Sequence, residues 1–110
     1  MSDTCLAYER RGAVAIITID DAPYNRMSLA FTDALEPLVA TIGSDATIRA
    51  VVITASGDQN FSVGMNLKEL GGALGDRERI DVIFDQRLRV LAAIENMDKP
   101  WIATLFGNCL

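Results

Sequence analysis

Two short runs of apolar, mostly β-branched residues constrain the fold of this chain more than any other feature. They read VAIITI at residues 14–19 and IRAVVITA at residues 48–55. The first run is almost wholly apolar, which is typical of a strand in a parallel sheet that is covered on both faces. Between the two runs, apolar residues recur at helical spacing. We therefore predict a strand, a helix and a parallel strand, joined by a right-handed crossover.

The predicted helix begins after Ser28, a favourable N-cap residue, and stops near Gly43. Pro37 lies inside it and removes one hydrogen bond, so we expect a bent or shortened helix, at a cost of about 3 kcal/mol. Upstream, residues 4–11 read as a further strand that turns at Arg11-Gly12. The apolar face of the helix consists of Phe31, Ala34, Leu35, Leu38, Val39 and Ile42.

The second half of the chain extends the same pattern. Residues 55–64 read as a loop, residues 66–70 as a short helical piece and residues 71–76 as a break. A long helix follows from Arg77 to about Met97, and residues 101–106 read as a third parallel strand. The expected inward face of the long helix is Ile80, Ile83, Phe84, Leu88, Leu91 and Ile94.

The last predicted strand is followed only by GNCL, without a helix to cover it. Parallel sheets are normally covered by helices on both faces, so this ending leaves apolar surface open. We therefore expect residues 1–110 to be the first part of a longer protein. The alternative is a complete short chain whose open edge is covered by a partner.

Charge and hydropathy exclude several classes of function. The net charge is −5 and the ten Lys and Arg are scattered, which argues against nucleic-acid binding. We interpret four arginines as the solvent-exposed face of a helix: Arg77, Arg79, Arg87 and Arg89. No apolar run reaches the ~18 residues that span a bilayer, and residues 1–12 lack a signal-peptide core. No membrane association and a cytoplasmic location are therefore the default expectation.

The cysteine and histidine content limits the possible chemistry. Cys5 and Cys109 lie near opposite ends without CxxC spacing, which favours reduced, structural cysteines. The sequence contains no histidine. Within this chain, that removes Ser–His and Cys–His nucleophile pairs and every histidine metal site, and no metal site is predicted.

The segment FSVGMN at residues 61–66 is the first candidate site. A strand end, a glycine turn and a helix start are where open α/β sheets bind ligands. The first N–H groups of a helix lack internal partners, so the N–H of Met65 could stabilise an oxygen that becomes negatively charged during a reaction. The alternative is a plain turn with Gly64 at positive φ.

The segment DDAPYNRMS at residues 20–28 is the second candidate. Asn25 and Arg26 could meet a phosphate or an adenine, since an arginine can form bidentate contacts to phosphate. The alternative is a loop that ends at the Ser28 cap. Lys68 could attract an anion, although a solvated helical position is the simpler interpretation for Lys68 and Glu69.

Taken together, these segments resemble the crotonase superfamily, the enoyl-CoA hydratase/isomerase family. The order and spacing of VAIITID, PYNRMS, IRAVVITASGDQNFSVGMNLKEL and KPWIATLFGNCL fit the family over nearly all 110 residues. Residues 61–69 are similar to the family pattern F-[SAC]-A-G-x-D-L-[KR]-E. The resemblance implies an α/β fold, a crotonase-like spiral of ββα units with a mostly parallel sheet, incomplete at its C-terminal end. Residues 1–110 would be the N-terminal part of an acyl-CoA-binding core domain.

The resemblance also implies a function. The substrate would be an acyl-CoA thioester, with coenzyme A as part of the substrate and no other cofactor. The thioester oxygen would lie between the N–H of Met65 and that of a glycine beyond Leu110, where the catalytic carboxylates of hydratases also fall. Residues that match the family's coenzyme A contacts are Asn25, Arg26, Met27, Val63, Gly64, Asn66, Leu67 and Lys68.

The activity expected from the resemblance is that of a lyase or isomerase of fatty acid metabolism, in a trimer or a dimer of trimers. This chain alone would carry half of the oxyanion site and should not turn over. The sequence departs from the family where Asn66 replaces a frequent Asp and where Val63 and Met65 replace small alanines. Met65 should reshape the acyl pocket. A non-catalytic coenzyme A-binding or assembly module is the alternative function.

Overall fold

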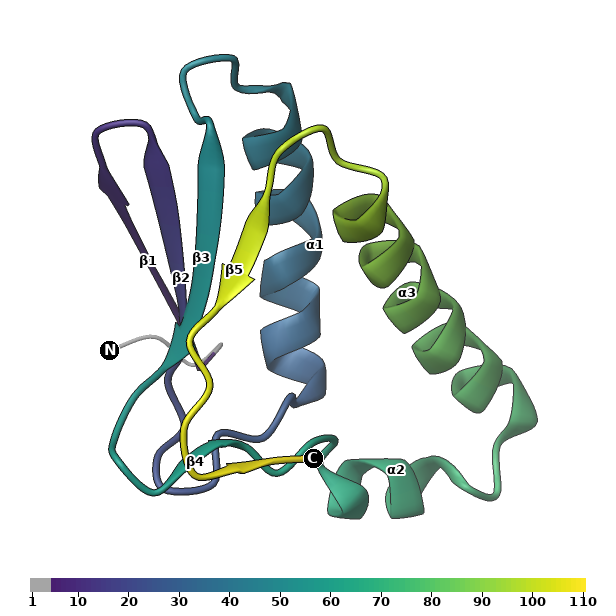
Figure 1. The fold of residues 1–110 in the computed structure, drawn as a ribbon. Coiled ribbons are helices and arrows are strands. Elements are labelled where there is room, and N and C mark those ends of the chain that lie inside the picture. The colour runs from purple at the N-terminus through teal and green to yellow at the C-terminus, as the bar shows by residue number, and fades with distance from the viewer. Residues whose placement is uncertain (1–4) are drawn as a thin grey trace.

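The computed structural model describes residues 5–110, so Thr4, where the first strand was expected to begin, and the rest of the N-terminal segment lie outside the described part. Strands β1 (Leu6–Arg11) and β2 (Val14–Ile19) form an antiparallel hairpin. Strands β3 (Ala50–Ala55) and β5 (Trp101–Ala103) continue the sheet in parallel with β2, in the order β1-β2-β3-β5 (Figure 1). The predicted α/β fold with a mostly parallel sheet is confirmed.

Helix α1 (Leu29–Ser44) connects β2 to β3, as predicted. The Ser28 hydroxyl accepts a hydrogen bond from the Phe31 N–H at 3.1 Å and so caps the helix. The helix continues through Pro37 to Ser44, so the expected shortening does not occur. The packing of α1 against the sheet offsets the hydrogen bond that the proline removes.

The hydrophobic core lies between α1 and one face of the sheet. Its largest side chains without solvent exposure include Ile17, Ile19, Phe31, Ile42 and Val51. The other face of β2 is only half-buried, which corrects the prediction of a strand covered on both faces. Figure 1 shows the reason, because α1 and α3 both lie on the same side of the sheet.

The second half of the chain differs from the prediction in three elements. Residues 55–64, expected as loop, contain strand β4 (Asn60–Ser62), which pairs in parallel with β6 (Asn108–Cys109). Helix α2 (Leu67–Ala73) runs through two glycines that were expected to break the chain. The predicted strand at residues 101–106 shortens to β5. Strands β4 and β6 depend on each other across a long stretch of sequence, and a local sequence pattern cannot reveal such a pairing.

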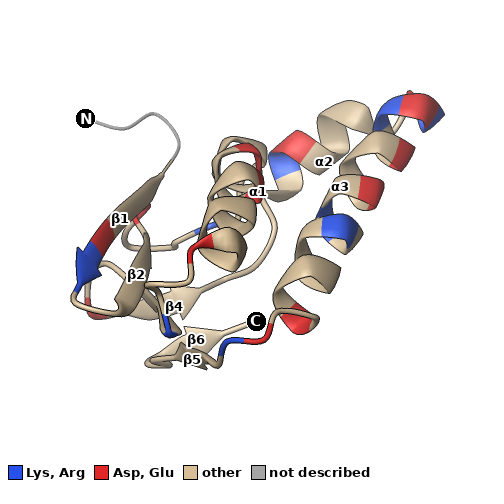
Figure 2. Cartoon of the chain, turned by 90° about the horizontal axis from the view of Figure 1, so that it is seen from above, with Lys and Arg blue, Asp and Glu red and all other residues tan. Residues whose placement is uncertain are grey.

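Helix α3 (Arg77–Glu95) packs beside α1 through a narrower face than predicted. Ile83 and Val90 are buried, whereas Phe84, Leu88 and Leu91 are exposed. Polar pairs lie beside the contact: Gln86 donates to Asp33 of α1 at 2.9 Å, and Arg89 is paired with Glu36 at 2.6 Å. Figure 2 shows charged residues of both signs spread along α3. The apolar residues of this helix therefore form two faces, of which one contacts the core.

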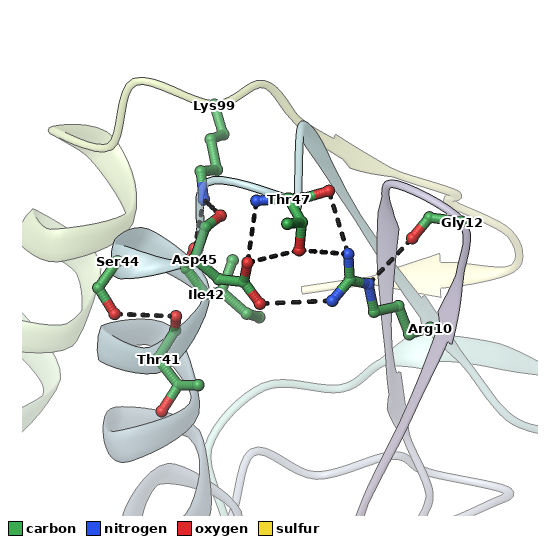
Figure 3. Close-up of polar contacts among 8 residues, drawn as sticks. All are labelled: Arg10, Gly12, Thr41, Ile42, Ser44, Asp45, Thr47 and Lys99. Carbon is green, nitrogen blue, oxygen red and sulfur yellow. Dashed lines mark hydrogen bonds and ion pairs between the residues drawn. The ribbon is translucent and has the colours of Figure 1, made fainter.

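A polar cluster of Arg10, Asp45, Thr47 and Lys99 ties three connections together at the amino end of the parallel strands (Figure 3). The Arg10 guanidinium donates to the Thr47 hydroxyl at 2.6 Å and faces the Asp45 carboxylate at 3.3 Å. The Lys99 ammonium donates to the backbone oxygens of Ile42 and Asp45 at the end of α1. This cluster leaves the opposite, carboxyl end of the strands for the candidate site.

Candidate active site

Three segments meet at the carboxyl end of the parallel strands. They follow β2, β3 and β5, and they lie together beside α2 in Figure 1. The Val63 N–H donates to the Tyr24 oxygen at 3.1 Å, and the Phe61 N–H donates to the Phe106 oxygen at 3.0 Å. The Leu110 N–H donates to the Ser62 oxygen at 3.0 Å. These backbone bonds hold the two predicted candidate segments against each other.

The turn at Gly64 sets the position of the Met65 N–H. Gly64 has a φ of +94°, a backbone conformation that residues with a Cβ disfavour. Its oxygen accepts a hydrogen bond from the Met27 N–H at 2.9 Å, and Met27 and Met65 form a parallel bridge. Asn66 caps α2, since its Oδ1 accepts from the N–H groups of Lys68 and Glu69 at 3.1 and 3.3 Å.

The Met65 N–H has no hydrogen-bond acceptor within residues 5–110, and Met65 is half-buried. A backbone N–H in such a position normally finds a partner in protein, water or a ligand. The positive φ of Gly64 agrees with both interpretations drawn from the sequence, a site that stabilises a negatively charged oxygen and a plain turn. The unpaired N–H is the feature that makes this turn able to receive an oxygen.

A pocket of about 420 Å³, here called the polar pocket because two cationic side chains border it, lies on one side of this turn. Its lining residues were all predicted as site residues: Arg26, Val63, Met65, Asn66, Leu67 and Lys68. The Arg26 guanidinium lies 4.7 Å from the centre of the Tyr24 ring and 3.8 Å from the Asp21 carboxylate. Two cationic side chains, Arg26 and Lys68, therefore border a pocket whose other walls are mostly apolar or amide.

An apolar pocket of about 520 Å³ lies on the other side of the turn. Its inner wall comes from α1 and α3 and includes Phe31, Leu35, Val90 and Leu91. Met27 and Gly64 also line it, and Val63 and Met65 border both pockets. A ligand with a polar end and an apolar end could therefore occupy both pockets and pass the Met65 N–H.

Asn25, a predicted site residue, borders neither pocket. Its side chain is 0% exposed, so it offers no surface to a ligand. Its Nδ2 donates to the oxygens of Ser56 and Asn60 at 2.8 and 2.7 Å, and its Oδ1 accepts from the Asp21 N–H at 3.0 Å. Asn25 therefore joins the loop after β2 to the loop after β3. Of the nine predicted site residues, the other eight border one or both pockets.

Two residues of this region were interpreted from the sequence as solvated helical positions. Glu69 accepts a hydrogen bond from the Leu29 N–H at 2.9 Å and so binds α2 to the start of α1. Arg87, expected on a wet face, instead lines the apolar pocket and donates from Nη2 to the Met27 oxygen at 2.9 Å. The helical spacing could have indicated the inward position of Arg87, because Arg87 falls between Ile83 and Val90 on one helical face.

The charge of Arg87 persists despite its surroundings. Burial lowers the pKa of its guanidinium, and the Glu69 carboxylate partly opposes this shift. An arginine is protonated at neutral pH even with a lowered pKa. Its Nε is buried and has no hydrogen-bond partner in the described structure. The apolar pocket therefore has a positive charge in its wall.

The fold and this turn define a class of α/β protein in which a strand, a glycine turn and a helix start present backbone N–H groups at the edge of a parallel sheet. Residues 9–110 match the family model described as enoyl-CoA hydratase/isomerase. The chain belongs to this family, and the resemblance drawn from its motifs is confirmed.

Individual relatives agree with the family match. The chain is 28% identical over 97 residues to a probable enoyl-CoA hydratase of Bacillus subtilis (strain 168), covering 88% of this chain and 37% of the relative. It is 28% identical over 103 residues to the carboxymethylproline synthase of Pectobacterium carotovorum subsp. carotovorum, covering 93% and 41%. The chain thus spans about two-fifths of the length of these relatives.

Solved structures share the fold. DspI of Pseudomonas aeruginosa superposes with a TM-score of 0.86 at 28% identity, over 96% of this chain and 39% of that protein. An enoyl-CoA hydratase of Mycobacterium smegmatis superposes with a TM-score of 0.83 at 32% identity, over 92% and 39%. The predicted crotonase-like fold, present here over part of its usual length, is confirmed.

Residues 5–110 also bear on membrane insertion and on metal binding. No helix there is long and apolar enough to cross a membrane. No group of three or more His, Cys, Asp or Glu side chains in the same range is placed to hold a metal ion. The cytoplasmic location and the lack of a separate cofactor stay predictions.

Proposed function

We propose that the protein containing this chain acts on acyl-CoA thioesters and that the Met65 N–H donates to the thioester oxygen as it becomes enolate-like. The observation that carries the proposal is the unpaired Met65 N–H at the junction of two pockets. The coenzyme A moiety occupies the polar pocket, where Arg26 and Lys68 attract phosphate. The acyl group enters the apolar pocket.

The N–H contributes to catalysis because it is fixed before the charge develops. Loss of one oxyanion donor typically costs about 2.7–4 kcal/mol of transition-state stabilisation. The second donor of the proposed site comes from the chain beyond Leu110. This agrees with the position of the Leu110 oxygen, 3.4 Å from where a Cβ on Gly64 would lie.

The acid and base also come from outside this chain. None of the described residues that line the apolar pocket is an aspartate or a glutamate. We therefore expect that residues 1–110 alone do not turn over a substrate. This observation also keeps the second candidate function open, that of a coenzyme A-binding or assembly module without catalysis.

The family reaction classes are lyase and isomerase, and we propose a hydratase of fatty acid metabolism as the first activity to test. We also propose a homotrimer or a dimer of trimers for the whole protein. Exposed apolar side chains on α3 and β5, including Leu88 and Ile102, support such an assembly because they need a cover.

The experiment uses the full-length protein with free coenzyme A and with enoyl-CoA thioesters of several chain lengths. Calorimetry measures binding, and the ultraviolet absorbance of the enoyl thioester measures turnover. Binding with turnover supports the enzyme, and binding without turnover supports the second candidate. Absence of binding to coenzyme A and to every thioester contradicts both.

A further inference from the structure

The guanidinium of Arg87 has hydrogen-bonding capacity that the described structure does not use. Its Nη2 donates to the Met27 oxygen at 2.9 Å, but its Nε has no partner and is buried. No carboxylate of residues 5–110 lies within ion-pair distance of this side chain. Glu69 affects Arg87 only through its field, and its carboxylate already accepts the Leu29 N–H at 2.9 Å.

A neighbouring arginine of α3 shows the contrast. Arg89, two positions further, faces α1 and is held by Glu36 through two hydrogen bonds of 2.6 and 3.0 Å. It does not line the apolar pocket, whereas Arg87 does. Of these two arginines, Arg89 has a complete ion pair, whereas Arg87 has no counterion and lies at the pocket.

A partly buried cation without a counterion is less favourable than a paired one, and proteins generally pair such groups. A guanidinium presents planar N–H donors that match the geometry of a carboxylate. The remaining walls of this pocket are largely apolar, so they would hold the carbon chain that carries such a group.

We propose that the apolar pocket selects an acyl-CoA whose acyl group carries a carboxylate, and that Arg87 binds this carboxylate. This inference rests on the proposed function, because it places the acyl group of a thioester in the pocket. Arg87 acts here as a specificity residue. Its contact with Met27 holds it against the segment that pairs with Met65.

The test compares two thioesters of similar chain length in the full-length protein: glutaryl-CoA, which ends in a carboxylate, and hexanoyl-CoA, which ends in a methyl group. Free coenzyme A is measured in parallel by calorimetry. The same measurements are made on Arg87→Met and Arg87→Lys. Arg89→Met is the matched control, since it removes an arginine of the same helix that does not face this pocket.

We expect glutaryl-CoA to bind more tightly than hexanoyl-CoA by about tenfold or more, as a charge-assisted hydrogen bond provides. Arg87→Met should abolish this preference, so that the affinity for glutaryl-CoA falls to that for hexanoyl-CoA. Arg87→Lys should keep part of the preference, and Arg89→Met all of it.

Equal affinity of the unmodified protein for the two thioesters, with normal binding of coenzyme A, would overturn the inference and leave the proposed function standing. A preference that survives Arg87→Met would overturn it as well. Loss of binding to both thioesters and to coenzyme A in the unmodified protein would contradict the proposed function itself. The comparison of glutaryl-CoA with hexanoyl-CoA on the unmodified protein tests the inference even if the Arg87→Met protein does not fold.

Discussion

The backbone N–H of Met27 donates to the oxygen of Gly64 at 2.9 Å. This bond joins the segment after β2 to the turn between β4 and α2, and it places the unpaired N–H of Met65 between the two pockets. Met27 is fixed in turn by Arg87, whose Nη2 donates to the Met27 oxygen at 2.9 Å. Three separate parts of the chain thus determine where one backbone donor lies.

Substitution of Gly64 should disturb this turn. In Gly64→Ala, the alanine backbone must adopt a φ near +94°, and its Cβ would lie 3.4 Å from the Leu110 oxygen. We expect a loss of about 1–2 kcal/mol in the free energy of unfolding, because an L-residue disfavours this conformation. Urea denaturation measures the change.

Gly71→Ala is the matched control for Gly64→Ala. Gly71 lies inside α2, and a Cβ there would contact nothing within 4 Å. We expect a gain of about 0.5–1 kcal/mol, since alanine favours a helix over glycine. Equal effects of the two substitutions would contradict the role assigned to the turn.

Asn25 should contribute to stability and not to direct ligand contact. Asn25→Ala leaves the oxygens of Ser56 and Asn60 without their donor, and each buried unsatisfied group costs about 1–3 kcal/mol. Chemical denaturation should therefore show a large loss of stability. Unchanged stability together with weakened coenzyme A binding would restore the contact expected from the sequence.

Arg26 and Lys68 should attract the phosphates of coenzyme A. Both line the polar pocket and are at least partly exposed, so each charge should contribute about 0.2–1 kcal/mol. Arg26→Gln with Lys68→Gln should weaken binding of free coenzyme A several-fold and reduce its dependence on salt. Arg79→Gln, on the exposed side of α3, serves as the control and should leave the affinity unchanged.

The polar cluster in Figure 3 predicts a dependence of stability on pH. The pKa of Asp45 is lowered from its ordinary value of 3.8, chiefly because the Thr47 hydroxyl donates to it, with further contributions from the Thr47 N–H and Arg10. A lowered pKa in the folded state stabilises the protein above the unfolded value and loses this effect as the pH falls through the folded value.

Asp45→Asn should therefore be less stable than the unmodified protein at neutral pH. The difference between the two proteins in the free energy of unfolding should stay constant down to about pH 5 and should shrink below about pH 4. Denaturation midpoints measured across this range test the sign. A difference that grows as the pH falls would contradict it.

The sequence predicted the elements whose patterns are local. The β-branched runs of β2 and β3 and the Ser28 cap of α1 are visible without partners, and the motif at residues 61–69 predicted the turn. The pairing of β4 with β6 could not be predicted, since it joins Asn60 to Asn108. The inward position of Arg87 was missed because a charged residue was assumed to face water. The buried position of Asn25 depends on acceptors more than thirty positions away.

The central claim is that the backbone N–H of Met65, and not its side chain, assists the reaction. The most direct measurement is the turnover of an enoyl-CoA thioester by full-length Met65→Pro, which lacks this N–H, beside Met65→Leu, which retains it. We predict that Met65→Pro lowers kcat by about 100- to 1000-fold while it still binds coenzyme A, and that Met65→Leu loses far less. Equal turnover by the two variants would contradict the account.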